Sequence, residues 1–175
     1  MDNAIIGNDK IHEVFSVFHD GIITNVKIDR ATLSFDVKIL YLAQRINTEF
    51  QKFYISLTDY KGLRFTTWPV INEAEVQEML DPDEIFKPEL EILSGELKDG
   101  QVQVMCNQPS PEFDYCGGEL SFSAELMTVM DEIGKNYSLK ELCALSRGYW
   151  EDWSKKTGGR EDITKDVTYF PINNE

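Results

Sequence analysis

The stretch Leu33-Ser34-Phe35-Asp36-Val37-Lys38-Ile39 decides the fold. Its apolar and polar residues alternate strictly, which is typical of a β-strand with one buried face and one face in water. Such a strand belongs to an antiparallel sheet, because parallel sheets are usually covered on both faces. Residues 22–28 show a similar alternation, and Asp29-Arg30-Ala31 is suited to the turn between the two runs. The sequence therefore predicts an antiparallel strand pair over residues 21–39.

Further strands of this kind follow along the chain. The alternation continues over residues 52–57, and Asp59-Tyr60-Lys61-Gly62 supplies turn residues before a strand that Trp68-Pro69 should end. Lys98-Asp99-Gly100 lies between two apolar runs and is the strongest hairpin signal in the chain. Residues 120–126 alternate again. Six residues are expected to face one core: Leu33, Phe35, Val37, Leu120, Phe122 and Leu126.

Two helices are expected. Residues 72–80 begin with the N-cap candidate Asn72, and Val76, Met79 and Leu80 would share one helical face before Pro82 ends the helix. Residues 138–153 begin with Ser138-Leu139-Lys140-Glu141, which has the pattern of a capping box. An apolar stripe that includes Tyr149, Trp150 and Trp153 follows at helical spacing. We expect this stripe to pack on the sheet, with a ligand or partner surface as the alternative.

These elements predict an α+β fold. It is an antiparallel β-meander of about seven strands, drawn as a strongly curved sheet or half-barrel. A short middle helix and a C-terminal amphipathic helix accompany it, and the long helix is expected to cover one sheet face. The 175 residues fit one domain, and residues 155–175 could instead form a loosely packed tail. Within that tail, Val167-Thr168-Tyr169-Phe170 is a candidate for a final edge strand.

Composition and charge narrow the classes of function. The formal net charge of -14 disfavours nucleic-acid binding, because phosphate backbones would be repelled. No run of apolar residues is long enough to span a membrane, and the first nine residues lack the pattern of a secretory signal. The three cysteines are too few and too widely spaced for a disulfide framework. We therefore expect an acidic, cytoplasmic protein with reduced thiols.

The residue types that perform catalysis are sparse. His19-Asp20 could be a histidine oriented by a carboxylate, or a local contact that fixes the start of the first strand. Cys116-Gly117-Gly118 has acidic neighbours, which disfavour a thiolate, so a small residue in a turn or bulge is the preferred interpretation. No metal-ligand, calcium-loop or phosphate-loop spacing is present. We expect no catalytic residue, no cofactor and no bound metal.

Acidic residues gather in two segments, residues 72–91 and residues 112–132. The first contains eight acids and a single base, Lys87. Such a segment is either a solvated surface or a docking surface for a basic protein partner. The candidate partner-binding residues are Glu73, Glu75, Glu78, Asp81, Asp83 and Glu84.

Phe18-His19-Asp20-Gly21-Ile22-Ile23, followed by Lys27-Ile28-Asp29 and residues 33–37, resembles the opening of certain bacterial immunity-protein families. The resemblance covers residues 11–68. It implies a small, acidic, β-rich cytoplasmic protein from a polymorphic-toxin neighbourhood, which occludes a cognate toxin in a toxin-antitoxin pair. It also implies that His19 and Asp20 are family landmarks without a catalytic role.

Two functions are therefore carried forward from the sequence. The first is a non-enzymatic binding protein, an immunity protein that neutralises a basic toxin by direct binding. The alternative is a small-molecule binding domain that uses the concave face of the sheet. The sequence leaves the oligomeric state open.

Overall fold

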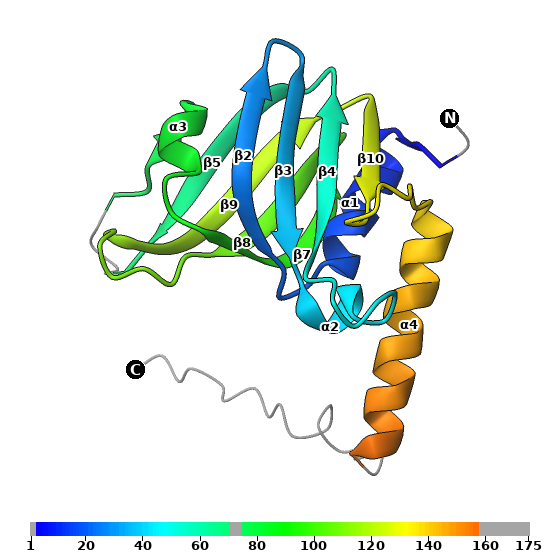
Figure 1. Ribbon diagram of the computed structural model, residues 1–175. Coiled ribbons are helices and arrows are strands. Elements are labelled where there is room, and N and C mark those ends of the chain that lie inside the picture. The colour runs from blue at the N-terminus through cyan, green and yellow to red at the C-terminus, as the bar shows by residue number, and fades with distance from the viewer. Residues whose placement is uncertain (1–2, 71–74, 158–175) are drawn as a thin grey trace.

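One antiparallel sheet organises the molecule (Figure 1). The computed structural model describes residues 3–70 and 75–157. In this part of the chain, ten strands pair in the order β1-β10-β4-β3-β2-β7-β8-β9-β5-β6, and four helices accompany them. The sheet curves but is not closed. The prediction of a mostly antiparallel sheet with a few helices is confirmed, while the expectation of about seven strands is too low.

The elements have the following bounds. The strands are β1 (Ile5–Ile6), β2 (Ile22–Asp29), β3 (Thr32–Lys38), β4 (Lys52–Thr58), β5 (Lys61–Pro69), β6 (Glu78–Met79), β7 (Leu90–Lys98), β8 (Gln101–Asn107), β9 (Tyr115–Ser123) and β10 (Leu126–Met130). The helices are α1 (Asn8–Val17), α2 (Leu40–Ala43), α3 (Pro82–Ile85) and α4 (Leu139–Lys156).

Two of the predicted hairpins are present. β2 and β3 pair around the turn at Arg30 and Ala31. β7 and β8 pair around Asp99 and Gly100, whose φ angles are 52° and 76°. Positive φ at both central residues matches the right-handed twist of the strands, which explains why Asp-Gly was a reliable signal.

The turn residues predicted at residues 59–62 form a corner, and the strands before and after them are not paired as a hairpin. β5 pairs with β9 and β6, not with β4. The pair β4 and β10 instead continues into the pair β5 and β9 with one register, because Thr58 faces Leu126 and Lys61 faces Ser123. The Glu125 amide donates to the Thr58 carbonyl oxygen (3.2 Å) between them. Two long bent strands therefore run side by side through the corner.

The corner also explains an error in the predicted core. Of the six residues expected to face inward, all are buried except Leu126, which is only half-buried. Residues 120–126 were expected to form one strand, but β9 ends at Ser123 and β10 starts at Leu126. The break shifts the alternation, and Met127 and Val129 become the buried residues of β10.

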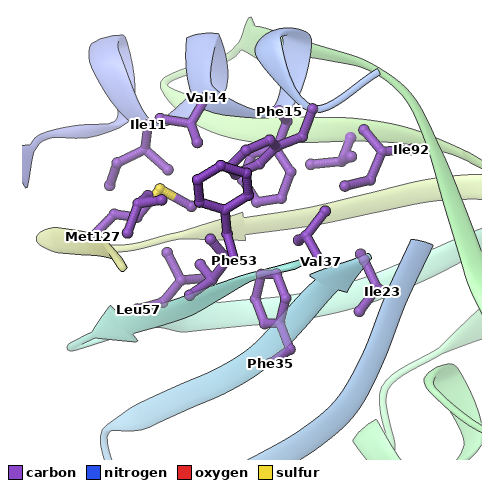
Figure 2. Close-up of a cluster of buried hydrophobic side chains, with 14 of the residues drawn as sticks. Ile11, Val14, Phe15, Ile23, Phe35, Val37, Phe53, Leu57, Ile92 and Met127 are labelled. Atoms are coloured by element: carbon purple, nitrogen blue, oxygen red, sulfur yellow. The ribbon is translucent and has the colours of Figure 1, made fainter. Parts of the chain in front are cut away.

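Helix α1 fills the concave side of the sheet. Its residues Ile11, Val14 and Phe15 point into the cluster of buried side chains from the strands (Figure 2). The Phe15 ring stacks on Phe35 of β3, with centroids 6.4 Å apart, and meets Phe122 of β9 edge-on at 5.8 Å. Because one ring contacts strands from both halves of the sheet, α1 is the centre around which the sheet curves.

Two glycines permit close approaches of backbone. A Cβ atom on Gly95 of β7 would collide with the His12 carbonyl oxygen of α1. A Cβ atom on Gly118 of β9 would collide with the Thr66 carbonyl oxygen of β5. Gly117 and Gly118 lie within β9, so no turn is formed at this pair. The register of β5 against β9 shifts by one residue between Trp68 and Pro69, which face Gly117 and Tyr115, so Cys116 lies at a bulge-like irregularity, in agreement with the bulge interpretation.

The helix expected over residues 72–80 is not formed by residues 75–80, and residues 72–74 lie outside the described part. Residues 78–79 form β6 at the edge of the sheet. The short middle helix is α3, and Pro82 begins it instead of ending one. The Asp81 carboxylate accepts from the Asp83 amide (3.0 Å) as the N-cap, and proline is favoured in the first turn because its missing N–H needs no partner there.

Helix α4 begins as predicted, but it packs elsewhere. The Ser138 hydroxyl accepts from the Glu141 amide (3.3 Å), and the Glu141 carboxylate accepts from the Ser138 amide (2.9 Å), which confirms the capping box. The helix contacts α1 and α2, so the expectation that it covers a sheet face is wrong. Residues 158–175, with the candidate strand over 167–170, lie outside the described residues.

Candidate functional site

The acidic segment forms an exposed edge of the molecule. Of the candidate partner-binding residues, Glu73 lies outside the described residues, and the other five are exposed. Glu75 lies before the edge strand β6 and Glu78 lies in it, while Asp83 and Glu84 lie in the first turn of α3. None of these five acids forms a salt bridge within residues 3–70 and 75–157. Asp81 already has a local role as the cap of α3.

Aliphatic side chains are exposed among these acids. Val76 is 62% exposed and Leu80 is 64% exposed. A shallow hollow also lies at α3, where Val26 and Ile28 of β2 line it together with Pro82, Asp83 and Phe86. The sequence had placed Val76 and Leu80 on one face of an expected helix, so this exposed apolar surface was missed. We call residues 75–84 with Ile28 the acidic-apolar face.

His19 and Asp20 lie at the junction of α1 with β2. The His19 Nδ1 atom lies 2.6 Å from the Leu93 carbonyl oxygen, and its Nε2 atom lies 3.2 Å from an Asp20 carboxylate oxygen. Asp20 has a φ of 66°, and its amide donates to the Ile92 carbonyl oxygen (2.8 Å). Since both ring nitrogens face acceptors, the pair ties the junction to β7.

Tyr41 of α2 supports the same junction. Its hydroxyl donates to the His19 carbonyl oxygen (2.7 Å). Burial, with smaller effects from Asp20 and Tyr149, raises the pKa of Tyr41 to about 12. The tyrosine therefore remains a neutral donor throughout the physiological range.

An aromatic surface extends from Tyr41 along α4. The ring centroids of Tyr41 and Tyr149 are 4.3 Å apart, and those of Trp150 and Trp153 are 6.0 Å apart. Trp150 is 42% exposed and Trp153 is 44% exposed. The expectation that this stripe packs on the sheet is wrong for the two tryptophans, because α4 runs past the body of the sheet (Figure 1).

The thiols lie in different surroundings, since Cys143 lines a hollow with His12 between α1 and α4, whereas Cys106 is enclosed in the core. Cys106 is fully buried in β8, and burial raises its thiol pKa to about 12. Burial also raises the pKa of the half-buried Cys143 thiol. Within the described ranges, no three or more His, Cys, Asp or Glu side chains gather as a metal site.

Acids of the second segment, residues 112–132, support loops. Asp131 is fully buried and accepts from the Tyr137 hydroxyl (2.9 Å) and the Lys135 amide (2.9 Å). Glu132 accepts from the backbone amides of Gln51 and Lys52. These two carboxylates are therefore committed to internal bonds.

A polar hollow that the sequence did not single out lies on the outer side of β2, β3 and β4. Asp36 of β3 is 8% exposed although it alternates with the core residues Phe35 and Val37. One oxygen of its carboxylate, Oδ2, accepts from Lys52 Nζ (2.8 Å) and from Asn25 Nδ2 (2.7 Å). The alternation of β3 predicted Asp36 as a solvent-facing residue, so only its burial could have marked this position.

Comparisons with protein-family models, curated proteins and solved structures give no match. No helix of the described residues is long and apolar enough to cross a membrane.

Proposed function

We propose that this chain is a non-enzymatic binding protein that docks a basic protein partner on its acidic-apolar face. The observation that carries the proposal is the position of Val76 and Leu80. Both are largely exposed, and both lie within three residues of Glu75, Glu78 or Asp81. Aliphatic side chains with a charged rim are typical of protein interfaces, where burial supplies affinity and charge supplies specificity.

The chemistry of the partner follows from this face. The centre of the partner's surface carries apolar side chains that cover Val76 and Leu80, and the rim of that surface carries Lys or Arg. Because Glu75, Glu78, Asp83 and Glu84 have no salt-bridge partner among the described residues, they are available to a cation from outside. In this proposal the partner is a basic toxin that the chain occludes, as the resemblance to immunity proteins implies.

The small-molecule alternative has a different place in the molecule. Ile11, Val14 and Phe15 of α1 occupy the concave side, which was expected to hold such a ligand. The packing of α1 favours protein docking over ligand binding inside the sheet. Any small ligand would instead use the outer hollow at Asp36.

The test begins with the product of the gene adjacent to this one, expressed with the chain and purified as a complex. Stopped-flow association is then measured with a variant in which Glu75, Glu78, Asp83 and Glu84 are changed to Lys. We expect several-fold slower association at low salt. The difference should shrink near physiological salt, where screening limits such forces to about 8 Å.

A matched variant controls for total charge. Changing Glu49, Glu96, Glu125 and Glu151 to Lys alters the net charge equally at exposed positions on other elements. This control should associate nearly as fast as the native chain. A Leu80→Ser variant should mainly accelerate dissociation, because it removes apolar contact without changing charge. Equal slowing by both charge variants, or no complex with the adjacent gene product, would refute the proposal for this face and this partner.

A further inference from the structure

The outer hollow at Asp36 is a half-open depression in the surface of the sheet. It has a volume of about 620 Å³, which lies within the range of roughly 300–1,000 Å³ that is typical of small-molecule sites. Its walls come from β2, β3 and β4, with Met130 of β10 at one side. These strands are packed on their other face by the core, so the floor of the hollow is rigid.

A β-bulge shapes one wall. Between Thr24 and Lys27 the register of β2 against β3 shifts by one residue, and Asn25 at the bulge has a φ of 52°. Left-handed backbone is costly for residues other than glycine, although asparagine tolerates it best. The bulge directs the Asn25 amide onto Asp36, and strain of this kind is often found at functional positions.

A row of donors crosses the hollow. Lys27, Ser34 and Ser56 face one another on adjacent strands, because Lys27 pairs with Ser34 and Ser34 pairs with Ser56. Lys27 forms no salt bridge with any residue that the structure describes. Lys52 uses one of its three N–H groups on Asp36 and lies 4.9 Å from the Tyr54 ring centroid. The Ser34 hydroxyl donates to the Lys27 carbonyl oxygen (3.4 Å), so the donors left for a ligand are the Lys27 ammonium, the remaining N–H groups of Lys52 and the Ser56 hydroxyl.

The charge of the lining is opposite to that of the molecule. Lys27 and Lys52 outnumber the single lining carboxylate, Asp36, whereas the whole chain has a formal net charge of -14. Val26 and Met130 add apolar wall. Donors and positive charge attract oxyanions, and the apolar wall suits a ring or an alkyl group.

We propose that the outer hollow binds a small organic anion, in which a carboxylate or phosphate group lies between Lys27 and Lys52 and an apolar body rests on Val26 and Met130. The Ser56 hydroxyl donates to the oxyanion. The site shares Val26 with the hollow at α3, but Lys27, Ser56 and Lys52 lie outside the acidic-apolar face, so charge variants of the two surfaces can be tested independently.

The experiment is a titration of the full ¹⁵N-labelled chain followed by amide correlation spectra. Phenyl phosphate and benzoate are the two anionic probes, and benzyl alcohol is the neutral probe. We expect saturable shifts confined to β2, β3, β4 and the end of β10 at Met130, with a Kd on the order of 1 mM for at least one anion. Comparison of the two anions distinguishes phosphate from carboxylate recognition.

Lys27→Gln is the test variant, because Lys27 is exposed and its loss should leave the fold intact. The affinity of this variant for the anion should fall by about fivefold or more, since one of the two lysine charges that contact the oxyanion is lost. Lys98→Gln removes an equal charge at the end of β7, outside the hollow, and should bind as the native chain does. The proposal is overturned if neither anion saturates, if benzyl alcohol binds equally well, or if both variants weaken binding to the same degree.

Discussion

The Phe15 side chain contacts both halves of the curved sheet, the half that contains β3 and the half that contains β9. It is fully buried, and it contacts Phe35 from one half and Phe122 from the other. Aromatic pairs of this geometry contribute beyond their buried area. The curvature of the sheet thus depends on a few rings whose positions along the chain are far apart.

Truncation of Phe35 or Phe122 to Ala should therefore cost about 3–5 kcal/mol, because each change leaves a cavity beside Phe15. Urea unfolding measures the loss. Leu126→Ala is the comparison, since Leu126 is half-buried on the opposite alternation, and it should cost clearly less. A loss below about 1 kcal/mol for both Phe variants would mean that this contact contributes little to the core.

The pair of Lys52 and Asp36 gives a second test at this scale. Lys52→Met leaves the Asp36 carboxylate nearly buried without its cation, and should cost about 2–3 kcal/mol, somewhat below a fully buried pair. The double variant Asp36→Val with Lys52→Met removes both charges and should recover most of that loss. Both values come from urea unfolding. A double variant as unstable as the single one would show that the pair itself stabilises the fold.

Among the elements, α4 could be predicted because its signal is local. Ser138 and Glu141 are three residues apart and complete the capping box within one turn. The hydrogen bonds from Ser138, and more weakly Lys135, lower the pKa of Glu141. A lowered carboxyl pKa stabilises the fold above the pKa of the unfolded chain, and this contribution is lost as pH falls through the folded value.

Ser138→Ala should accordingly cost about 1 kcal/mol at neutral pH, because the backbone amide of Glu141 loses its acceptor, the Ser138 hydroxyl. The difference between the native chain and this variant should narrow as pH falls through the lowered pKa of Glu141, where its carboxylate becomes protonated. Chemical unfolding at pH 7 and at acidic pH provides both values. If the difference in unfolding free energy stays constant between neutral and acidic pH, the cap stabilises the helix independently of the charge of Glu141.

The elements that were missed divide into two kinds. Helix α1 had a signal, since Ile11, Val14, Phe15 and Phe18 follow helical spacing, and all four are buried. The corner between β4 and β5 had none, because Asp59 and Gly62 carry the same positive-φ preference in a bend as in a hairpin. Which strand a given strand pairs with is decided by contacts across the whole chain. The local sequence therefore predicted where strands form better than it predicted the order in which they pair in the sheet.

The candidate surfaces follow the same division. The acids of residues 75–84 were evident from composition, but Val76 and Leu80 became visible only when β6 replaced the expected helix. The outer hollow was hidden because Asp36 and Lys52 each occupy ordinary polar positions of an alternating strand. Only the pairing of β3 with β4, together with the bulge in β2, brings Asn25, Asp36 and Lys52 together.

At the scale of the whole molecule, the net charge of -14 sets the response to salt. Like charges repel more in the compact state than in the unfolded chain, so added NaCl should raise stability by screening that repulsion. Between roughly 0.01 M and 0.15 M salt, the screening length falls from about 30 Å to about 8 Å, and most of the gain should occur in this range. Urea unfolding at fixed pH measures it.

The lysine variant of Glu75, Glu78, Asp83 and Glu84 tests where the repulsion arises. This variant makes the net charge less negative and breaks up the densest group of acids. Its stability should therefore rise at low salt and depend less on NaCl. The matched variant of Glu49, Glu96, Glu125 and Glu151 makes the net charge less negative by the same amount, but it removes acids that are spread over other parts of the chain. A larger effect for the first variant means that the acidic-apolar face is held at a cost in stability, as a surface kept for a cationic partner would be. Equal effects would mean that total charge alone governs the response and that the clustering of these acids carries no cost.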